Sequence, residues 1–503
     1  MGNKDHLSQI LEGTKSWNGW REYFPEIQPN LGEENLQKVD LTGANLTKTN
    51  FSGANLKNAN LSGANFSNAN LINTNCTKAK FQGAVFSGAT CINAIFSEAN
   101  LKNANLSDSN FTSANFSKAN LEKANLTNTC LANGNLTNAK ITEAVLKKSN
   151  FTDAILIKAN FSNSNLSWSI LDFADLSGSN LSSTDLEFAR FSDAILKKAT
   201  IVRSSLDDTV LSGADLSGAN LFDSSFRNAF MVGSNLSKTN LEKSEFLRTN
   251  LMSADLSDSN LTRSNLVYSN LENANLTRAK LIETNLQQTN LDGANFSNAI
   301  LRDCKIYGIS AWEIKGKPRQ ISNLIITRDN DAEMTVENLQ VAQFLYLLLN
   351  NENLRDIIEV TTSKVVLILG NFSDERKRIL DGIKEEIKIF DLTPVMFDFT
   401  KPSSRNLTET IGLLARMSKY IIADITDPRS VPHELFSVIP DCPSVKIYPI
   451  IEKSPQKDDK SYGMFADYAQ YQNVMELSNY RNYSDVKRIL AKINRKKENS
   501  ENQ

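Results

Sequence analysis

An unbroken five-residue period constrains this chain more than any other feature of its sequence. From Leu41 to Ile306, every fifth residue is a large apolar side chain or, at two positions, a cysteine, which gives 54 consecutive units. From Leu46 onward, a small residue stands two positions before each large one. A period of five fits neither an α-helix, at 3.6 residues per turn, nor a flat strand, at two. It predicts a coil that turns a corner every five residues and points one large and one small side chain inward per side.

The repeated unit reads A-N-L-x-x, as in Ala44-Asn45-Leu46 and Ala54-Asn55-Leu56. Over residues 41–310 the chain therefore resembles the pentapeptide-repeat family. The resemblance implies a right-handed quadrilateral β-helix with four units per coil, and a rod roughly 65 Å long at about 4.8 Å per coil. We expect the asparagine before each large residue to adopt the turn conformations of the corners.

Residues 1–40 are expected to form an N-terminal helical cap. Trp17, Trp20 and Phe24 recur at helical spacing until Pro25 interrupts the pattern. Such a stripe could bind a ligand, but the ends of a stacked solenoid need covering. We therefore favour a cap over a ligand site.

The surface of the repeat region gives no sign of catalysis or of DNA mimicry. Residues 41–310 contain 24 basic and 22 acidic side chains and no histidine. Some members of the family mimic DNA through acidic surfaces and bind a type II topoisomerase, and this balanced charge disfavours that function.

Apolar residues directly before the core position, such as Ile155, Ile170 and Phe230, fall on several sides of a 20-residue coil. They are not expected to define one docking face.

After residue 310 the pattern changes to alternating strands and helices. A helix is predicted over 335–350, and the stretch 315–319 is interpreted as a linker or capping loop. Apolar strands are predicted at 364–370, 394–399, 419–425 and 444–451, with helices at 374–389, 407–417, near 431–439 and at about 484–493. Continuous apolar strands separated by helices predict an α/β domain with a doubly wound parallel sheet.

Ligands of such sheets bind beyond the carboxyl ends of the strands. The residues that follow the first three predicted strands supply a glycine turn, arginines and carboxylates, which suit a nucleotide or ribosyl ligand. The candidate ligand-binding residues are Gly370, Asn371, Phe372, Arg376, Asp398, Arg405, Asp424 and Asp427. A purely structural interpretation, with aspartates that cap a helix and arginines that pair with them, stays open.

This domain resembles the TIR and nucleoside 2-deoxyribosyltransferase-like group. The similarity lies in a first strand that ends in Gly370, an A-D-x-x-D end to the third strand (Ala423 to Asp427), and Glu434 on the following helix. In that group a helix-borne glutamate acts on the sugar carbon as a base leaves, so Glu434 is the candidate catalytic residue. NAD or another nucleotide is the implied ligand. The residues before Glu434 depart from the usual run of small side chains, which weakens the case for catalysis more than the case for the fold.

Composition limits the remaining classes of function. The five cysteines form no C-x-x-C pair and the chain has two histidines, so no metal site is predicted. No stretch is long and apolar enough to span a bilayer and no export signal is apparent, so we expect a cytoplasmic protein without a membrane partner. The net charge of −2 gives no sign of nucleic-acid binding.

The predicted organisation is a cap (1–40), a β-helix (41–310), a linker with a connecting helix (311–362), a TIR-like domain (363–496) and a disordered tail (497–503). We interpret the chain as a non-enzymatic interaction scaffold with a protein partner. The alternatives are an enzyme that cleaves the N-glycosidic bond of NAD or a nucleoside through Glu434, and a DNA mimic that binds a topoisomerase. Whether the chain forms homo-oligomers stays open.

Overall fold

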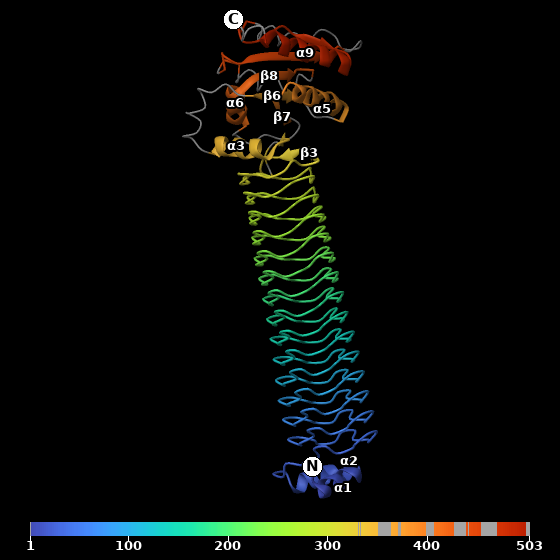
Figure 1. Ribbon diagram of the computed structural model, residues 1–503. Coiled ribbons are helices and arrows are strands. Elements are labelled where there is room, and N and C mark those ends of the chain that lie inside the picture. The colour runs from blue at the N-terminus through green and yellow to red at the C-terminus, as the bar shows by residue number, and fades with distance from the viewer. Residues whose placement is uncertain are drawn as a thin grey trace. The chain divides into compact units, whose positions relative to one another are not determined.

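The computed structural model describes residues 2–329, 331, 333–350, 364–370, 374–398, 407–426, 439–440, 442–453 and 470–498. The chain divides into two compact units, one formed by 1–300 with 312–320 and the other by 301–311 with 321–503. The first unit is a β-helix solenoid of stacked coils (Figure 1). Its parallel bridges join each residue to the one twenty positions later, beginning with Asn30 and Asn50, so four five-residue units make one coil.

The corner of each unit lies two residues after the core residue, not at the asparagine before it. Lys48, Asn58 and the equivalent residues of later units have φ near +60°, the left-handed conformation. Asn50, by contrast, lies in the bridge between coils. Its side-chain oxygen accepts from the Ser52 amide at 3.0 Å, and its amide nitrogen donates to Asn30 of the preceding coil at 2.9 Å. The expectation that these asparagines form the corners was therefore wrong, because their side chains are used to link coils.

The interior of the solenoid consists of stacked side chains with no solvent exposure at the large positions. Phe66 and Phe86, one coil apart, stack with ring centroids 4.8 Å apart. Where the small position holds a hydroxyl, that group commonly donates either to the previous coil, as Thr74 does to the Phe51 carbonyl at 2.8 Å, or within its own unit, as Ser149 does to the Leu146 carbonyl at 2.6 Å. Each coil therefore buries its core against its two neighbours.

Two short helices, α1 (Lys4–Leu11) and α2 (Thr14–Tyr23), cover the first coils. Trp17 of α2 is fully buried and donates to the Asn45 carbonyl at 2.7 Å. Asn18 accepts from the Asn45 amide at 2.7 Å, and Arg21 donates to the Thr47 carbonyl at 3.0 Å. These side chains satisfy backbone groups that have no coil below them.

The coil register is longer at both ends than the uninterrupted repeat in the sequence. Leu31 and Leu36 are buried core residues, ten and five residues before Leu41. At the other end, Ala311 is buried at the core position after Ile306, and Lys315 still bridges Asn295. The segment 315–319, which was expected to be a linker or capping loop, therefore begins within the coil register. At this end of the repeat the core positions hold small residues, Ala311 and Gly316, in place of large ones. Short strands occur at β1 (Lys280–Ile282), β2 (Ile300–Arg302) and β3 (Gln320–Ser322).

The described residues of the second unit form a seven-stranded mixed sheet in the order β10-β9-β8-β6-β7-β5-β4. Five strands are parallel, whereas β5 runs antiparallel to β7 and β4 antiparallel to β5. Ile325 of the edge strand β4 also bridges Lys305, twenty residues earlier in the same unit. The strands are β4 (Leu324–Ile325), β5 (Met334–Val336), β6 (Val365–Gly370), β7 (Thr393–Asp398), β8 (Ser418–Asp424), β9 (Lys446–Glu452) and β10 (Ser478–Tyr480).

The sequence-based prediction of a helix from residue 335 was wrong at its start. Met334 and Val336 are buried and pair with the sheet as β5, and α3 covers Leu339–Asn350. Asn338 caps α3, since its side-chain oxygen accepts from the amides of Gln340 and Val341 at 2.8 and 3.0 Å.

Helices α5 (Asp374–Ile389) and α9 (Tyr483–Glu498) share one apolar core with β6 and β8. Helix α6 (Leu407–Met417) also contacts both of these strands. Glu337, which follows β5, forms ion pairs with Lys384 and Lys388 of α5. The antiparallel edge is therefore linked to the parallel part of the sheet by charge as well as by backbone pairing.

The Phe stack allows a test of how the solenoid holds its coils together. Phe86→Ala should remove about 3–5 kcal/mol of local stability, because it leaves a cavity between coils that cannot collapse independently. Hydrogen exchange of the amides in the adjacent coils would measure the loss. Phe86→Leu is the matched control, since Leu occupies the equivalent position one coil later at Leu106. Equal exchange in the two variants would contradict this account.

Candidate ligand and partner sites

Two of the predicted ligand residues lie side by side at the carboxyl edge of the second unit's sheet. β6 ends at Gly370 and β8 ends at Asp424, and the two strands are parallel neighbours. A Cβ added to Gly370 would lie 3.6 Å from the Asp424 Cβ and 3.2 Å from Leu380 of α5. Glycine at this position therefore permits the close packing of α5.

Both carboxyl oxygens of Asp424 are engaged by neighbouring side chains. Asp424 is 1% exposed. One of its oxygens accepts from the amide of Thr426 at 3.0 Å and from the Thr426 hydroxyl, and the other accepts from the Tyr480 hydroxyl at 3.1 Å. The Thr426 hydroxyl in turn accepts from the Glu452 amide at 2.9 Å. These bonds join the ends of β8, β9 and β10, which gives Asp424 a structural role.

The other predicted site residues are only partly covered by the structure. Asp398 ends β7 opposite Gly370, and Arg376 lies in α5, but the side chains of both lie outside the described residues. Asn371, Phe372, Arg405, Asp427 and the candidate catalytic residue Glu434 also lie outside the described residues. Among the residues that are described, no three His, Cys, Asp or Glu side chains are grouped closely enough to hold a metal ion.

The solenoid carries an aromatic cluster of which the sequence analysis considered Ile170 and Phe230 but missed the corner residues. The Trp168 and Phe188 rings, one coil apart at the same corner, stack at 4.4 Å with an angle of 16° between them. In a neighbouring column, parallel β-bridges join Ile170 to Arg190, Arg190 to Val210, and Val210 to Phe230 in successive coils. Phe173 occupies the next corner. We define the aromatic cluster as Trp168, Ile170, Phe173, Phe188, Val210 and Phe230.

The four aromatic members of this cluster are exposed to solvent, whereas Ile170 and Val210 are half-buried. Most corner residues of the solenoid are Asn, Gly or charged. Trp168, Phe173 and Phe230 are 55–56% exposed and Phe188 is 40% exposed. The expectation of no single docking face considered only residues before the core position. The missed signal was the residue two positions after it, which places Trp168 and Phe188 exactly one coil apart.

A family model for pentapeptide repeats, described as "Pentapeptide repeats (8 copies)", matches residues 30–88, 94–197, 201–266 and 269–306 in overlapping segments. The matched residues exceed half of the chain. The chain belongs to the pentapeptide-repeat family. None of the matched segments lies beyond residue 306. No curated protein matches the chain in sequence.

Similar solved structures include other pentapeptide-repeat proteins. HetL, a protein involved in heterocyst differentiation regulation from the cyanobacterium Nostoc sp. strain PCC 7120, is 27% identical, with a TM-score of 0.19 over 50% of this chain and 94% of HetL. QnrB1, a plasmid-mediated fluoroquinolone resistance protein, is 14% identical, with a TM-score of 0.16 over 37% and 89%. A protein of the Arabidopsis thaliana thylakoid lumen is 30% identical, with a TM-score of 0.10 over 26% and 68%.

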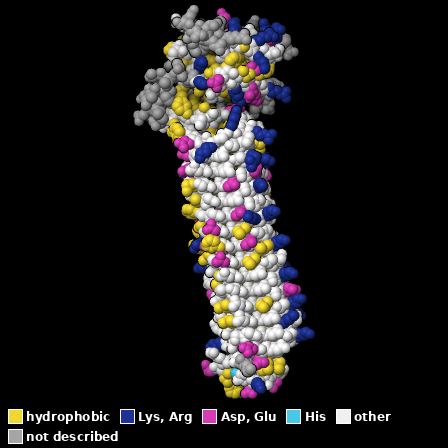
Figure 2. Space-filling view, in the orientation of Figure 1, with side chains coloured by type: hydrophobic (Ala, Val, Ile, Leu, Met, Phe, Trp, Pro, Cys, Tyr) yellow, Lys and Arg dark blue, Asp and Glu magenta, His cyan; other side chains and the backbone are white. Residues whose placement is uncertain are grey.

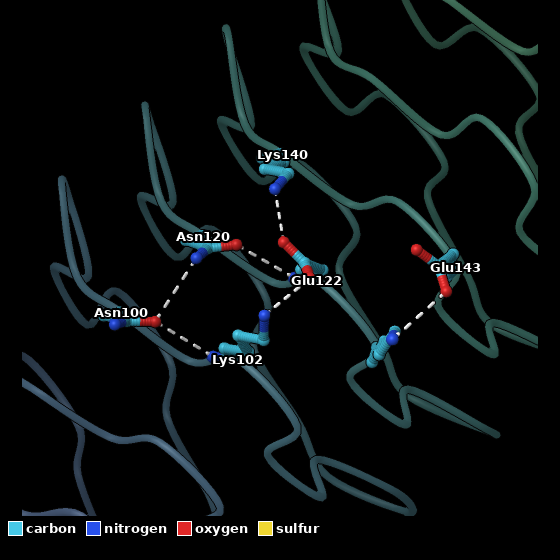
Figure 3. Close-up of polar contacts among 7 residues, drawn as sticks. Asn100, Lys102, Asn120, Glu122, Lys140 and Glu143 are labelled. Atoms are coloured by element: carbon cyan, nitrogen blue, oxygen red, sulfur yellow. Dashed lines mark hydrogen bonds and ion pairs between the residues drawn. The ribbon is translucent and has the colours of Figure 1, made fainter.

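Charged side chains on the pentapeptide-repeat solenoid form ladders from coil to coil. The Glu122 carboxylate accepts hydrogen bonds from the ammonium group of Lys102, at 2.7 Å, and from that of Lys140 (Figure 3). The side-chain amide of Asn120 donates to the side-chain oxygen of Asn100 in the preceding coil at 3.4 Å. Hydrogen bonds from the two lysines lower the pKa of Glu122 to about 2. Because the folded pKa is depressed, the contribution of this group to stability is present above the pKa of the unfolded chain. It is lost as the pH falls towards 2.

The structural role of Asp424 can be tested by removing one of its donors. Tyr480→Phe leaves a buried carboxyl oxygen without its partner and should cost about 1–3 kcal/mol. Tyr420→Phe is the matched control, because the Tyr420 hydroxyl donates at 2.9 Å to the side chain of Asn494 and should cost about 1 kcal/mol. Hydrogen exchange of the β8 and β9 amides would measure both. A Tyr480→Phe variant with unchanged exchange would argue against the structural assignment.

Proposed function

We propose that this pentapeptide-repeat protein is a non-enzymatic interaction scaffold. In this proposal the solenoid binds a protein partner through the aromatic cluster. The second unit is a TIR-like, doubly wound α/β domain that binds a nucleotide, such as NAD, or a second protein. The single observation that carries the proposal is the aromatic cluster, whose Trp168, Phe173, Phe188 and Phe230 side chains are exposed on a surface built mainly from Asn, Ser and charged residues.

The chemistry of the cluster favours a partner with apolar and basic side chains. Trp and other aromatic residues are typical binding hot spots, since they bury a large area with little loss of side-chain entropy. Asp153 and Asp193 occupy the corner positions one coil before and one coil after Phe173, and Asp208 follows Phe188 in the same way. A lysine or arginine of the partner would meet these carboxylates, and could also lie over the exposed rings.

The TIR-like assignment of the second unit is supported by its strand order. Numbered along the chain, the five parallel strands occur in the order 2-1-3-4-5, with the reversal between β6 and β8. Ligands of doubly wound sheets bind at such a reversal. Gly370 and Asp424 lie there, but both have structural roles in packing and hydrogen bonding. This arrangement favours a binding domain over a catalytic one.

Substitutions within one corner column test the protein-binding role. Trp168→Asn with Phe188→Asn should reduce capture of a specific polypeptide from a lysate of the producing cells at least about ten-fold, because two hot-spot side chains are lost. Asn suits the left-handed backbone of both positions. Tyr268→Asn is the control, at the same corner, with similar conformation and 57% exposure. A partner that the control loses and the double variant keeps would overturn the assignment to the aromatic cluster.

The absence of enzymatic activity is tested separately with purified protein. Wild type and Glu434→Ala are incubated with NAD and with common nucleosides, and released base is measured, also under conditions that promote oligomers. We expect no release from either protein. Release by the wild type that the Glu434→Ala variant lacks would instead establish an N-glycosidic-bond-cleaving enzyme, with the solenoid as its targeting arm.

A further inference from the structure

One corner of the solenoid carries basic residues at every second coil. They stand two residues after the core position, have φ between 55° and 61°, and are exposed. Forty residues, or two coils, separate each from the next, so the spacing is about 10 Å and the line is about 60 Å long. We define the basic edge as Lys38, Lys78, Lys118, Lys158, Lys198, Lys238 and Arg278.

The charge is concentrated at this corner and not spread around the solenoid. Of the fourteen corner positions from 38 to 298, seven are basic and two, Glu98 and Asp258, are acidic. Between residues 33 and 300, the other three corners have four, three and no basic residues. Figure 2 shows basic side chains spaced along one edge of the solenoid. The near-neutral total charge of the repeat therefore conceals a strongly asymmetric surface.

Most of these side chains are available to a partner. Lys78 pairs with Glu98 at 3.5 Å and Arg278 pairs with Asp258 at 2.6 Å. The other five basic-edge residues form no ion pair with any described residue of the chain. Further lysines lie in the columns on either side of the edge, at Lys57, Lys80, Lys140, Lys197 and Lys280.

Local structure does not explain the choice of lysine. The left-handed conformation favours Gly and Asn, and these residues occupy alternate positions of the same corner at Asn58, Asn138, Gly178 and Gly218. The Lys158 stem lies over Gly178, where an added Cβ would be 3.6 Å from the lysine Cγ. A contact of this kind needs no charge.

We propose that the basic edge binds the surface of an anionic lipid membrane. A straight line of cations can approach a plane with all of its members at once, and each lysine near such a surface strengthens binding about five-fold. No apolar segment is needed for this peripheral contact, so the proposal departs from the sequence-based expectation of no membrane partner, which rested on the lack of a spanning segment. No helix in the part of the chain that the structure describes has the length and apolarity that a bilayer span requires.

Nucleic acids fit the basic edge less well than a plane does. A duplex strand winds around its axis about every 34 Å, so a straight line of about 60 Å meets the same strand only about twice. Single strands are usually held by aromatic stacking together with charge. The basic edge and its two flanking columns contain no aromatic residue between residues 37 and 300. A DNA mimic would need charge of the opposite sign.

The test uses the full chain and phosphatidylcholine vesicles with or without phosphatidylserine, in a co-sedimentation assay. Wild type should bind the phosphatidylserine vesicles preferentially, and binding should fall as salt rises to about 0.15 M. Substitution of Lys118, Lys158, Lys198 and Lys238 by Asn should weaken binding at least about 100-fold, at about five-fold per lysine. Asn suits the left-handed backbone, so the coils are expected to remain folded, and thermal unfolding would check this.

The control variant replaces Lys48, Lys123, Lys148 and Lys243 by Asn. These lysines have the same backbone conformation but lie at two other corners, so the change in net charge is identical. The control should bind almost as well as wild type. Equal losses in both variants, or no preference of wild type for phosphatidylserine, would overturn the proposal.

Binding of single-stranded or duplex DNA in place of the vesicles, lost in the basic-edge variant, would assign the edge to nucleic acid instead. The assay needs no partner of the aromatic cluster, so its outcome is independent of the proposed scaffold function.

Discussion

The backbone hydrogen bonds between successive coils determine the structure of the solenoid. The amide of each core residue donates to a carbonyl nineteen residues ahead, as Leu46 does to Asn65 at 2.8 Å, and the corner residues repeat the pattern, as Lys48 does to Ser67 at 2.9 Å. Since side chains are not part of this ladder, the surface can vary freely while the backbone stays fixed. The stacking of phenylalanines, the asparagine bonds and the columns of charge all depend on the same twenty-residue register.

The sequence predicted the solenoid well because its signal is a strict period of burial. Its end points were less clear, since Ala311 occupies a core position with a small side chain, and Glu34 and Val39 stand where a small residue would precede Leu36 and Leu41. The helix boundaries of α5 and α6 were predicted correctly. The strand β5 was not, because a strand of three residues is too short to carry a periodic signal of its own.

The candidate sites illustrate a different limit. Asp424 was selected for its place at the end of a strand, but its partner Tyr480 is 56 residues away in sequence and could not be inferred from spacing. The aromatic cluster and the basic edge, in contrast, were present in the sequence as residues twenty and forty positions apart. Counting charge over the whole repeat gave a near balance of 24 basic and 22 acidic side chains. The asymmetry of charge lies around the solenoid axis, so it becomes visible only when each residue is assigned to its position within a coil.

Four units per coil also tie the length of the chain to the direction in which its side chains point. Insertion of a single five-residue unit would preserve the core and the ladder, yet it would rotate every later column by a quarter turn. Lys118 and Lys158 would then face different sides if the insertion fell between them. Only an insertion of twenty residues, or a multiple of twenty, leaves the direction of every column around the solenoid axis unchanged. This solenoid can therefore lengthen by whole coils without loss of its surface pattern, whereas any shorter insertion would disrupt that pattern.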